Sequence, residues 1–229
     1  MKAHYYFDWF DKGMPKQIAE ALLCDIPERK SLVFIGSDPS DYSFNIEQFD
    51  IAMRWLEPVG VIFDEYSLVD NRTTKEATRR LVKCASAIFL LGGKAAVQRA
   101  FLDEYGLHAA IKESSATSIM GVSAGAMNMS AKWISSKYIS MGSMRYTAGE
   151  TKFYDGLGLD NFALEAHIDI ENTKLIGNDL FPLSQTIDVY AASYESAIRV
   201  KNGEMKFFGD VYLISESKIQ KMKESDFVE

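Results

Sequence analysis

The sequence predicts an α/β fold in which helices cover both faces of a mostly parallel sheet. Short, continuous apolar runs recur along the first half of the chain, and segments with helical spacing lie between them. Continuous apolar runs indicate strands that are covered on both faces, and their alternation with helices is typical of parallel sheets. Because the chain shows no linker and no internal repeat, we expect residues 1–229 to form a single domain.

The predicted elements follow one another in a regular order. Four apolar runs predict strands at 31–36, 59–63, 87–93 and 118–122, and helical spacing predicts helices at 15–23, 44–56, 73–85 and 95–105. Later apolar runs predict strands at 164–168, 189–194, 197–200, 205–209 and 211–214. The Asn202-Gly203 pair predicts a hairpin turn, because both residue types accept positive φ angles. We therefore expect the C-terminal part to add antiparallel strands to the same sheet.

Composition excludes several classes of function. The net charge of −7 argues against nucleic acid and acidic membranes as partners, because both select basic surfaces. No apolar run is long enough to span a membrane, and the first residues do not form a signal peptide. Two cysteines make no disulfide framework, and three unclustered histidines argue against a metal site. We expect a cytoplasmic protein that is a monomer or a homodimer.

The segment Gly121-Val122-Ser123-Ala124-Gly125 fits the pattern G-x-S-x-G of a nucleophile elbow. A predicted strand precedes Ser123 and a helical pattern follows it, so a sharp turn exposes its hydroxyl above the sheet edge. At the start of a helix, the backbone N–H of Ala124 can stabilise a developing oxyanion. An ordinary serine N-cap is the alternative interpretation.

A serine hydroxyl is a poor nucleophile at neutral pH and needs an adjacent base. His4 lies near the N-terminus, where we expect a frayed segment, and His108 follows a predicted helix far from the elbow. His167 lies near the end of a predicted strand. His167 is therefore the candidate general base, with a half-buried structural histidine as the alternative.

The stretch Gly-Val-Ser-Ala-Gly-Ala at 121–126 resembles the nucleophile motif of the peptidase E (aspartyl dipeptidase) and cyanophycinase family of serine peptidases. The run from Phe89 to Lys94, followed by a helix, resembles the strand, glycine-rich loop and helix of that family. The resemblance covers roughly residues 30 to 215 and implies a class I glutamine amidotransferase-like fold. The chain order serine, histidine, acid differs from the order serine, acid, histidine of α/β-hydrolases.

The resemblance implies roles for further residues. Glu195 falls where the family has its acid, and by resemblance it orients the imidazole and stabilises its protonated form. Asp169 is an alternative acid, because residues two apart on a strand share a face. Gly93 would supply a second oxyanion N–H, as in the family's glycine loop. Lys94, which follows directly, departs from the family pattern and bears on how a substrate amino group is held.

These observations together predict a serine-type peptidase of the peptidase E kind. Ser123, His167 and Glu195 would form its catalytic triad, and dipeptides or short peptides would be its substrates. The mechanism needs no metal and no organic cofactor. The alternative is a catalytically silent homologue that binds a small peptide or an amino acid, and an esterase is a further possibility.

Overall fold

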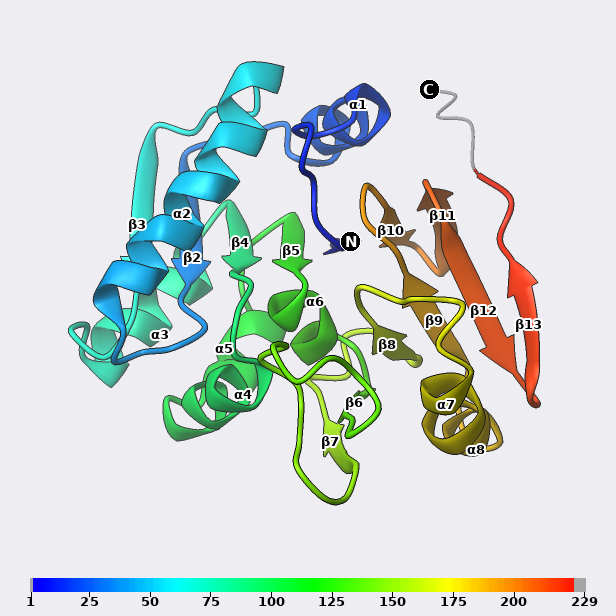
Figure 1. Cartoon of the computed structure of the whole chain (residues 1–229). Coiled ribbons are helices and arrows are strands. Elements are labelled where there is room, and N and C mark those ends of the chain that lie inside the picture. Colours follow the sequence, from blue (N-terminus) through cyan, green and yellow to red (C-terminus); the bar gives the residue numbers. More distant parts are fainter. Residues whose placement is uncertain (1, 225–229) are drawn as a thin grey trace.

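The structure is a computed structural model that describes residues 2–224 and contains two sheets (Figure 1). The first sheet has seven strands in the order β11-β10-β1-β5-β4-β2-β3. Its strands are β1 (Ala3–Phe7), β2 (Ser31–Ile35), β3 (Glu65–Val69), β4 (Ala87–Leu90), β5 (Ser118–Val122), β10 (Ala197–Lys201) and β11 (Glu204–Phe208). Strands β1, β5, β4, β2 and β3 are parallel, whereas β10 and β11 are antiparallel to their neighbours.

The second sheet has six strands in the order β13-β12-β9-β8-β6-β7. Its strands are β6 (Lys132–Ser135), β7 (Lys152–Asp155), β8 (Ala163–Glu165), β9 (Val189–Ala192), β12 (Val211–Ser215) and β13 (Lys218–Lys221). It mixes parallel and antiparallel pairs, and it lies beside β10 and β11 in the view of Figure 1.

Helices cover both faces of the first sheet. They are α1 (Lys16–Asp25), α2 (Tyr42–Leu56), α3 (Lys75–Cys84), α4 (Ala95–Glu104), α5 (Leu107–Lys112) and α6 (Ala124–Met129). Apolar residues of α1 and α2 pack against one face, and those of α3 to α6 pack against the other together with residues of the second sheet. The outer face of the second sheet is covered by α7 (Thr173–Leu175), the π-helix η2 (Ile176–Leu180) and α8 (Phe181–Ser184).

The predicted α/β fold class is confirmed. The predicted hairpin turn is also confirmed, since Lys201 pairs with Glu204 and both turn residues, Asn202 and Gly203, have positive φ. Strands β10 and β11 join the first sheet as expected. The expectation that the predicted C-terminal strands join that sheet is wrong for β8, β9 and β12, which belong to the second one.

The strand predicted at 59–63 is wrong. Residues Glu57–Val59 form a 3₁₀ turn that ends at Gly60 with φ 81°, and the strand begins only at Glu65. Val61 and Phe63 are buried, which explains the apolar run, but they fill the core from a loop. Strand β3 is an edge strand with mostly half-buried residues, so its own sequence carries a weaker apolar signal.

The segment that holds His4 is the central strand β1, not a frayed end. It lies between β5 and β10, and Tyr5, Tyr6 and Phe7 are at most 1 % exposed. Because β1 is covered on both faces, its side chains enter two different cores.

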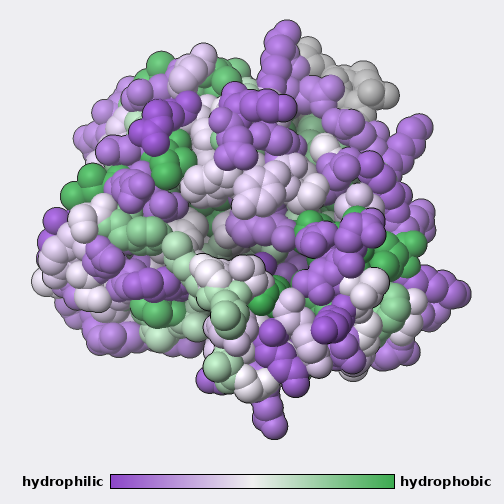
Figure 2. Space-filling view, in the orientation of Figure 1, coloured by the Kyte–Doolittle hydropathy of each residue, from purple (hydrophilic) through white to green (hydrophobic). Residues whose placement is uncertain are grey.

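The surface is mainly hydrophilic on the face shown in Figure 2, where apolar residues form small separate patches. Among the helices of residues 2–224, none is both long and apolar enough to cross a bilayer.

Candidate active site

Ser123 lies in a sharp turn between β5 and α6. Its φ of 49° is positive, a conformation that a non-glycine residue rarely adopts and that recurs at functional sites. The backbone N–H of Ser123 donates to the carbonyl of Phe7 at 2.9 Å, which fixes the turn to the end of β1. The turn has the strand-to-helix geometry that the motif predicts.

The glycines of the motif are required by close packing. A Cβ at Gly121 would lie 2.6 Å from the backbone of Gly125, and a Cβ at Gly125 would overlap the backbone carbonyl of Leu90. These contacts let α6 start directly over the sheet, so the serine is presented at the carboxyl ends of the parallel strands. Ligands of open α/β sheets bind at this edge.

The structure brings Ser123 and His167 together. His167 follows β8 after one residue, and its Nε2 lies 2.7 Å from Ser123 Oγ. His167 itself has a φ of 57°, and its ring lies 5.0 Å from the ring of Tyr194. The hydroxyl is therefore within hydrogen-bond reach of a base, as nucleophilic catalysis requires.

Asp8 is the carboxylate that contacts His167. Its Oδ1 lies 2.5 Å from His167 Nδ1, and its Oδ2 accepts the backbone N–H of His167 at 2.6 Å. Asp8 directly follows β1 and is fully buried. Since it holds both the ring and the backbone of the histidine, it fixes the imidazole with Nε2 toward the serine.

The position expected for Glu195 beside the imidazole is thus occupied by Asp8, which corrects the sequence-based expectation. The Glu195 Oε1 atom instead accepts the backbone N–H groups of Asp11 at 2.8 Å and Lys12 at 3.2 Å. The Glu195 N–H donates to the Trp9 carbonyl at 2.8 Å. Glu195 therefore orders the loop that follows Asp8.

Asp169, the alternative acid, is exposed and points elsewhere. Its Oδ1 accepts the backbone N–H of Glu171 at 3.0 Å in a local turn. Among the side chains of residues 2–224, the carboxylate placed at the Nδ1 atom of His167 is that of Asp8.

A pocket of about 270 Å³ opens at this hydrogen-bonded chain. Ser123 and His167 line it together with Gly93, Arg145 and an aromatic and polar wall formed by Trp9, Phe44, Gln48 and Tyr194. Gly93 has a φ of 131°, and a Cβ there would overlap Ser37 and the Phe44 ring. The glycine loop therefore fits against Ser37 and Phe44 only because position 93 lacks a side chain.

Lys94, which departs from the family pattern, forms an ion pair. Its Nζ lies 2.7 Å from Asp38 Oδ2, and this hydrogen bond lowers the pKa of Asp38 and raises the pKa of Lys94. The ammonium is therefore held by a neighbouring loop.

Arg145 is a pocket residue whose charge is already paired. Its guanidinium donates to Glu165 Oε1 at 2.8 Å and to the Ala166 carbonyl at 2.7 Å. Burial raises the pKa of Glu165 and outweighs the opposing effect of Arg145. Glu165 Oε2 has no hydrogen-bond partner within the described part of the chain.

Sequence reasoning missed Asp8 as a site residue, and it could not place Arg145 at the pocket. Asp8 carries a usable signal, because it directly follows a strand, as Ser123 does. Arg145 lies in the long segment between β6 and β7, for which no periodicity predicts a position.

Two solved structures share this fold. A peptidase from an acI-B1 actinobacterium matches with a TM-score of 0.66 and 17 % identity, over 99 % of this chain and 96 % of that one. A candidate peptidase E protein from Listeria monocytogenes matches with a TM-score of 0.62 and 18 % identity, over 90 % of this chain and 98 % of that one. No curated protein sequence matches this chain.

The model of peptidase family S51 matches residues 11–208, which is most of the sequence. The chain therefore belongs to peptidase family S51.

Proposed function

We propose that this protein hydrolyses dipeptides or short peptides with Ser123 as nucleophile, His167 as general base and Asp8 as the acid that orients the base. The observation that carries the proposal is one continuous chain of contacts, 2.7 Å from Ser123 to His167 and 2.5 Å from His167 to Asp8. Family membership alone implies a serine peptidase, and this geometry supports a specific set of residues.

The steps follow from the geometry. His167 Nε2 takes the proton of the Ser123 hydroxyl as Oγ attacks the peptide carbonyl carbon. The C–N bond then breaks, and the imidazolium gives its proton to the leaving amine. Water, deprotonated by the same nitrogen, attacks the acyl-enzyme ester. The bond between the acyl carbon and Ser123 Oγ then breaks, the imidazolium returns its proton to Oγ, and the acid is released. Asp8 keeps the proton on Nδ1 throughout and stabilises the imidazolium.

The oxyanion would be held by backbone N–H groups of Ala124 and Gly93. Ala124 is the first residue of α6, so its N–H has no partner inside the helix. Gly93 lines the pocket beside Ser123. Donors of this kind typically contribute a factor of about 10² to 10³ in rate.

A small substrate fits the pocket best. The pocket volume of about 270 Å³ lies just below the range of ~300 to ~1,000 Å³ that is usual for ligand sites. The guanidinium of Arg145 is paired with Glu165, so the pocket offers no free cation there for an acidic substrate side chain. We therefore propose that the protein is not a strict N-terminal-aspartate dipeptidase.

We further propose that residues 1–229 act as one cytoplasmic domain, as a monomer or a homodimer. The proposed triad draws on both sheets, since β1 and β5 belong to the first and β8 to the second. Cys24 and Cys84 are free and exposed, which suits a reducing compartment.

The experiment is covalent labelling with a fluorophosphonate probe, followed by a cleavage screen over a short-peptide library. Wild-type protein should be labelled at Ser123, whereas Ser123→Ala and His167→Ala should not. Peptide hydrolysis should be lost in the same two variants. A folded wild-type protein that takes up no label and cleaves no peptide would support the catalytically silent homologue instead.

A further inference from the structure

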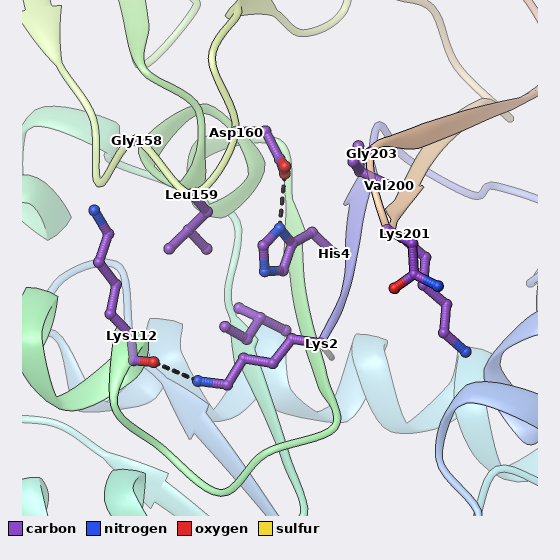
Figure 3. A pocket seen from close by; sticks show the side chains of 11 residues that line it. Lys2, His4, Lys112, Gly158, Leu159, Asp160, Val200, Lys201 and Gly203 are labelled. Carbon is purple, nitrogen blue, oxygen red and sulfur yellow. Dashed lines mark hydrogen bonds and ion pairs between the residues drawn. The ribbon is translucent and has the colours of Figure 1, made fainter.

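A second pocket lies at the amino ends of the parallel strands of the first sheet, whereas Ser123 lies at their carboxyl ends (Figure 3). Its volume is about 500 Å³, larger than that of the pocket at Ser123. It is formed where β1 and β5 begin, beside the end of α5 and the hairpin turn between β10 and β11. The two sites lie at opposite ends of β5, whose five residues separate them by roughly 13 to 16 Å.

This second pocket carries positive charge in a protein of net charge −7. Lys112 lines it, and within residues 2–224 no carboxylate pairs with its ammonium. Lys2 Nζ donates to the carbonyls of Ile111 at 3.2 Å and Lys112 at 2.5 Å, so its charge is not neutralised either. Burial lowers the pKa of Lys2. Lys201, in contrast, is paired with Asp25 outside the pocket.

A histidine held by a carboxylate faces the same space. His4 Nδ1 lies 2.7 Å from Asp160 Oδ2, and the buried Tyr6 hydroxyl donates to the same oxygen at 2.6 Å. Figure 3 shows His4 Nε2 on the side away from Asp160, facing the side chain of Lys2, while the Lys112 ammonium lies beside Gly158 with Leu159 between it and the His4 ring. The Asp160 carboxylate is therefore engaged by two hydrogen bonds, while the imidazole edge and the Lys112 ammonium remain open to a ligand.

The remaining wall of this pocket is apolar. It is formed by Leu159 and Val200, because Ile119 at the same wall is fully buried and offers no surface to a ligand. A ligand that fits both the positively charged side and the apolar wall has one anionic group and an apolar chain. A monoanion suits the site better than a dianion, because one ammonium is free and the carbonyl end of α5 lies beside it.

We propose that this second pocket binds a small organic monocarboxylate with an apolar chain. Its carboxylate pairs with the Lys112 ammonium, and its chain packs on Leu159 and Val200 beside the His4 imidazole. The proposal is independent of the chemistry at Ser123.

The test uses the three histidines of the protein as reporters. A ¹H–¹³C NMR spectrum of the imidazole Cε1–Hε1 groups contains one peak for each, and His4→Gln assigns the peak of His4. Sodium hexanoate is titrated into the wild-type protein, with hexanamide as the neutral match and inorganic phosphate as the anion without a chain. Hexanoate should shift the His4 peak saturably, with a Kd on the order of 1 mM. Hexanamide and phosphate should shift it much less, and the His167 peak should stay in place.

Two variants with the same change of charge complete the design. Lys112→Gln should weaken hexanoate binding about fivefold, the size of one partly exposed ion pair. Lys16→Gln removes an 89 % exposed lysine of α1 and should leave binding unchanged. The proposal is overturned if hexanoate does not move the His4 peak, if hexanamide moves it equally, or if Lys112→Gln binds hexanoate as the wild type does.

Discussion

Replacement of Asp8 by asparagine tests the proposed triad most directly. Asp8 Oδ2 accepts the backbone N–H of His167, and Oδ1 contacts the Nδ1 atom of its ring. In Asp8→Asn the amide oxygen must accept the backbone N–H of His167, because the flipped side chain would place its NH₂ group against that N–H donor. The amide NH₂ then faces Nδ1 and forces the ring proton to Nε2. That nitrogen lies 2.7 Å from Ser123 Oγ and can no longer accept its proton.

The expected loss is large and specific. A triad acid changed to its amide lowers kcat by about 10⁴, or about 5.4 kcal/mol at 1.36 kcal/mol for each factor of ten. The side chains are nearly isosteric, so the unfolding midpoint of Asp8→Asn should stay close to that of the wild type. The assay is kcat on the best dipeptide of the cleavage screen, with labelling by the fluorophosphonate as a second readout.

Glu195→Gln is the matched control. Both backbone N–H groups that Glu195 accepts go to its Oε1, and a glutamine carbonyl can accept the same pair. We expect kcat to fall less than about tenfold, because the loop of Asp8 stays ordered. If Glu195→Gln proves as damaging as Asp8→Asn, or if Asp8→Asn keeps wild-type turnover, the assignment of Asp8 is refuted.

Three further predictions concern the oxyanion loop, the buried ion pairs and specificity. Gly93→Ala should lower kcat/KM at least about 100-fold, because its methyl group would overlap neighbouring side chains and displace an oxyanion donor; wild-type kinetics would contradict that role. Burial raises the pKa of Asp25, but hydrogen bonds, the largest from Arg199, outweigh it and lower the pKa overall. This carboxylate therefore stabilises the fold above the unfolded pKa of about 3.9, and the stabilisation is lost as pH falls through the folded pKa. Urea unfolding should show Asp25→Asn less stable by about 3 kcal/mol at pH 7 and by much less near pH 3; an equal difference at both pH values would contradict it. Because Arg145 is paired with Glu165, kcat/KM for Asp-Leu should exceed that for Leu-Leu by less than about 100-fold, or 2.7 kcal/mol, and a larger preference would show a free cation at the site.

Local patterns predict the elbow at Ser123 and its strand well. The elbow at Ser123 depends on small residues within four positions, and the buried run at 118–122 is visible as a continuous apolar stretch. His167 follows from the scarcity of histidines and its place near a strand end. Each of these predictions needs only neighbouring residues.

The acid could not be predicted in the same way. Which carboxylate reaches the imidazole depends on which strands are neighbours, and β1 lies next to β5 although more than 100 residues separate them. Glu195 is expected only from its match in order and spacing to the family that the sequence resembles. Strand β1 itself is short and rich in aromatic residues, a composition that favours strands. Three strands of the second sheet, β8, β9 and β12, are visible as apolar runs, but which sheet they join depends on pairing between distant segments.

The central place of β1 links hydrolytic competence to completion of the fold. Asp8 reaches His167 only when β1 has inserted between β5 on one side and β10 on the other. A register slip of one residue would turn Asp8 to the opposite face of the sheet. Strand β10 begins at Ala197, so during synthesis most of the chain must emerge before this pairing can close. A newly made chain therefore cannot form the contact between Asp8 and His167 until segments from both halves of the sequence have paired.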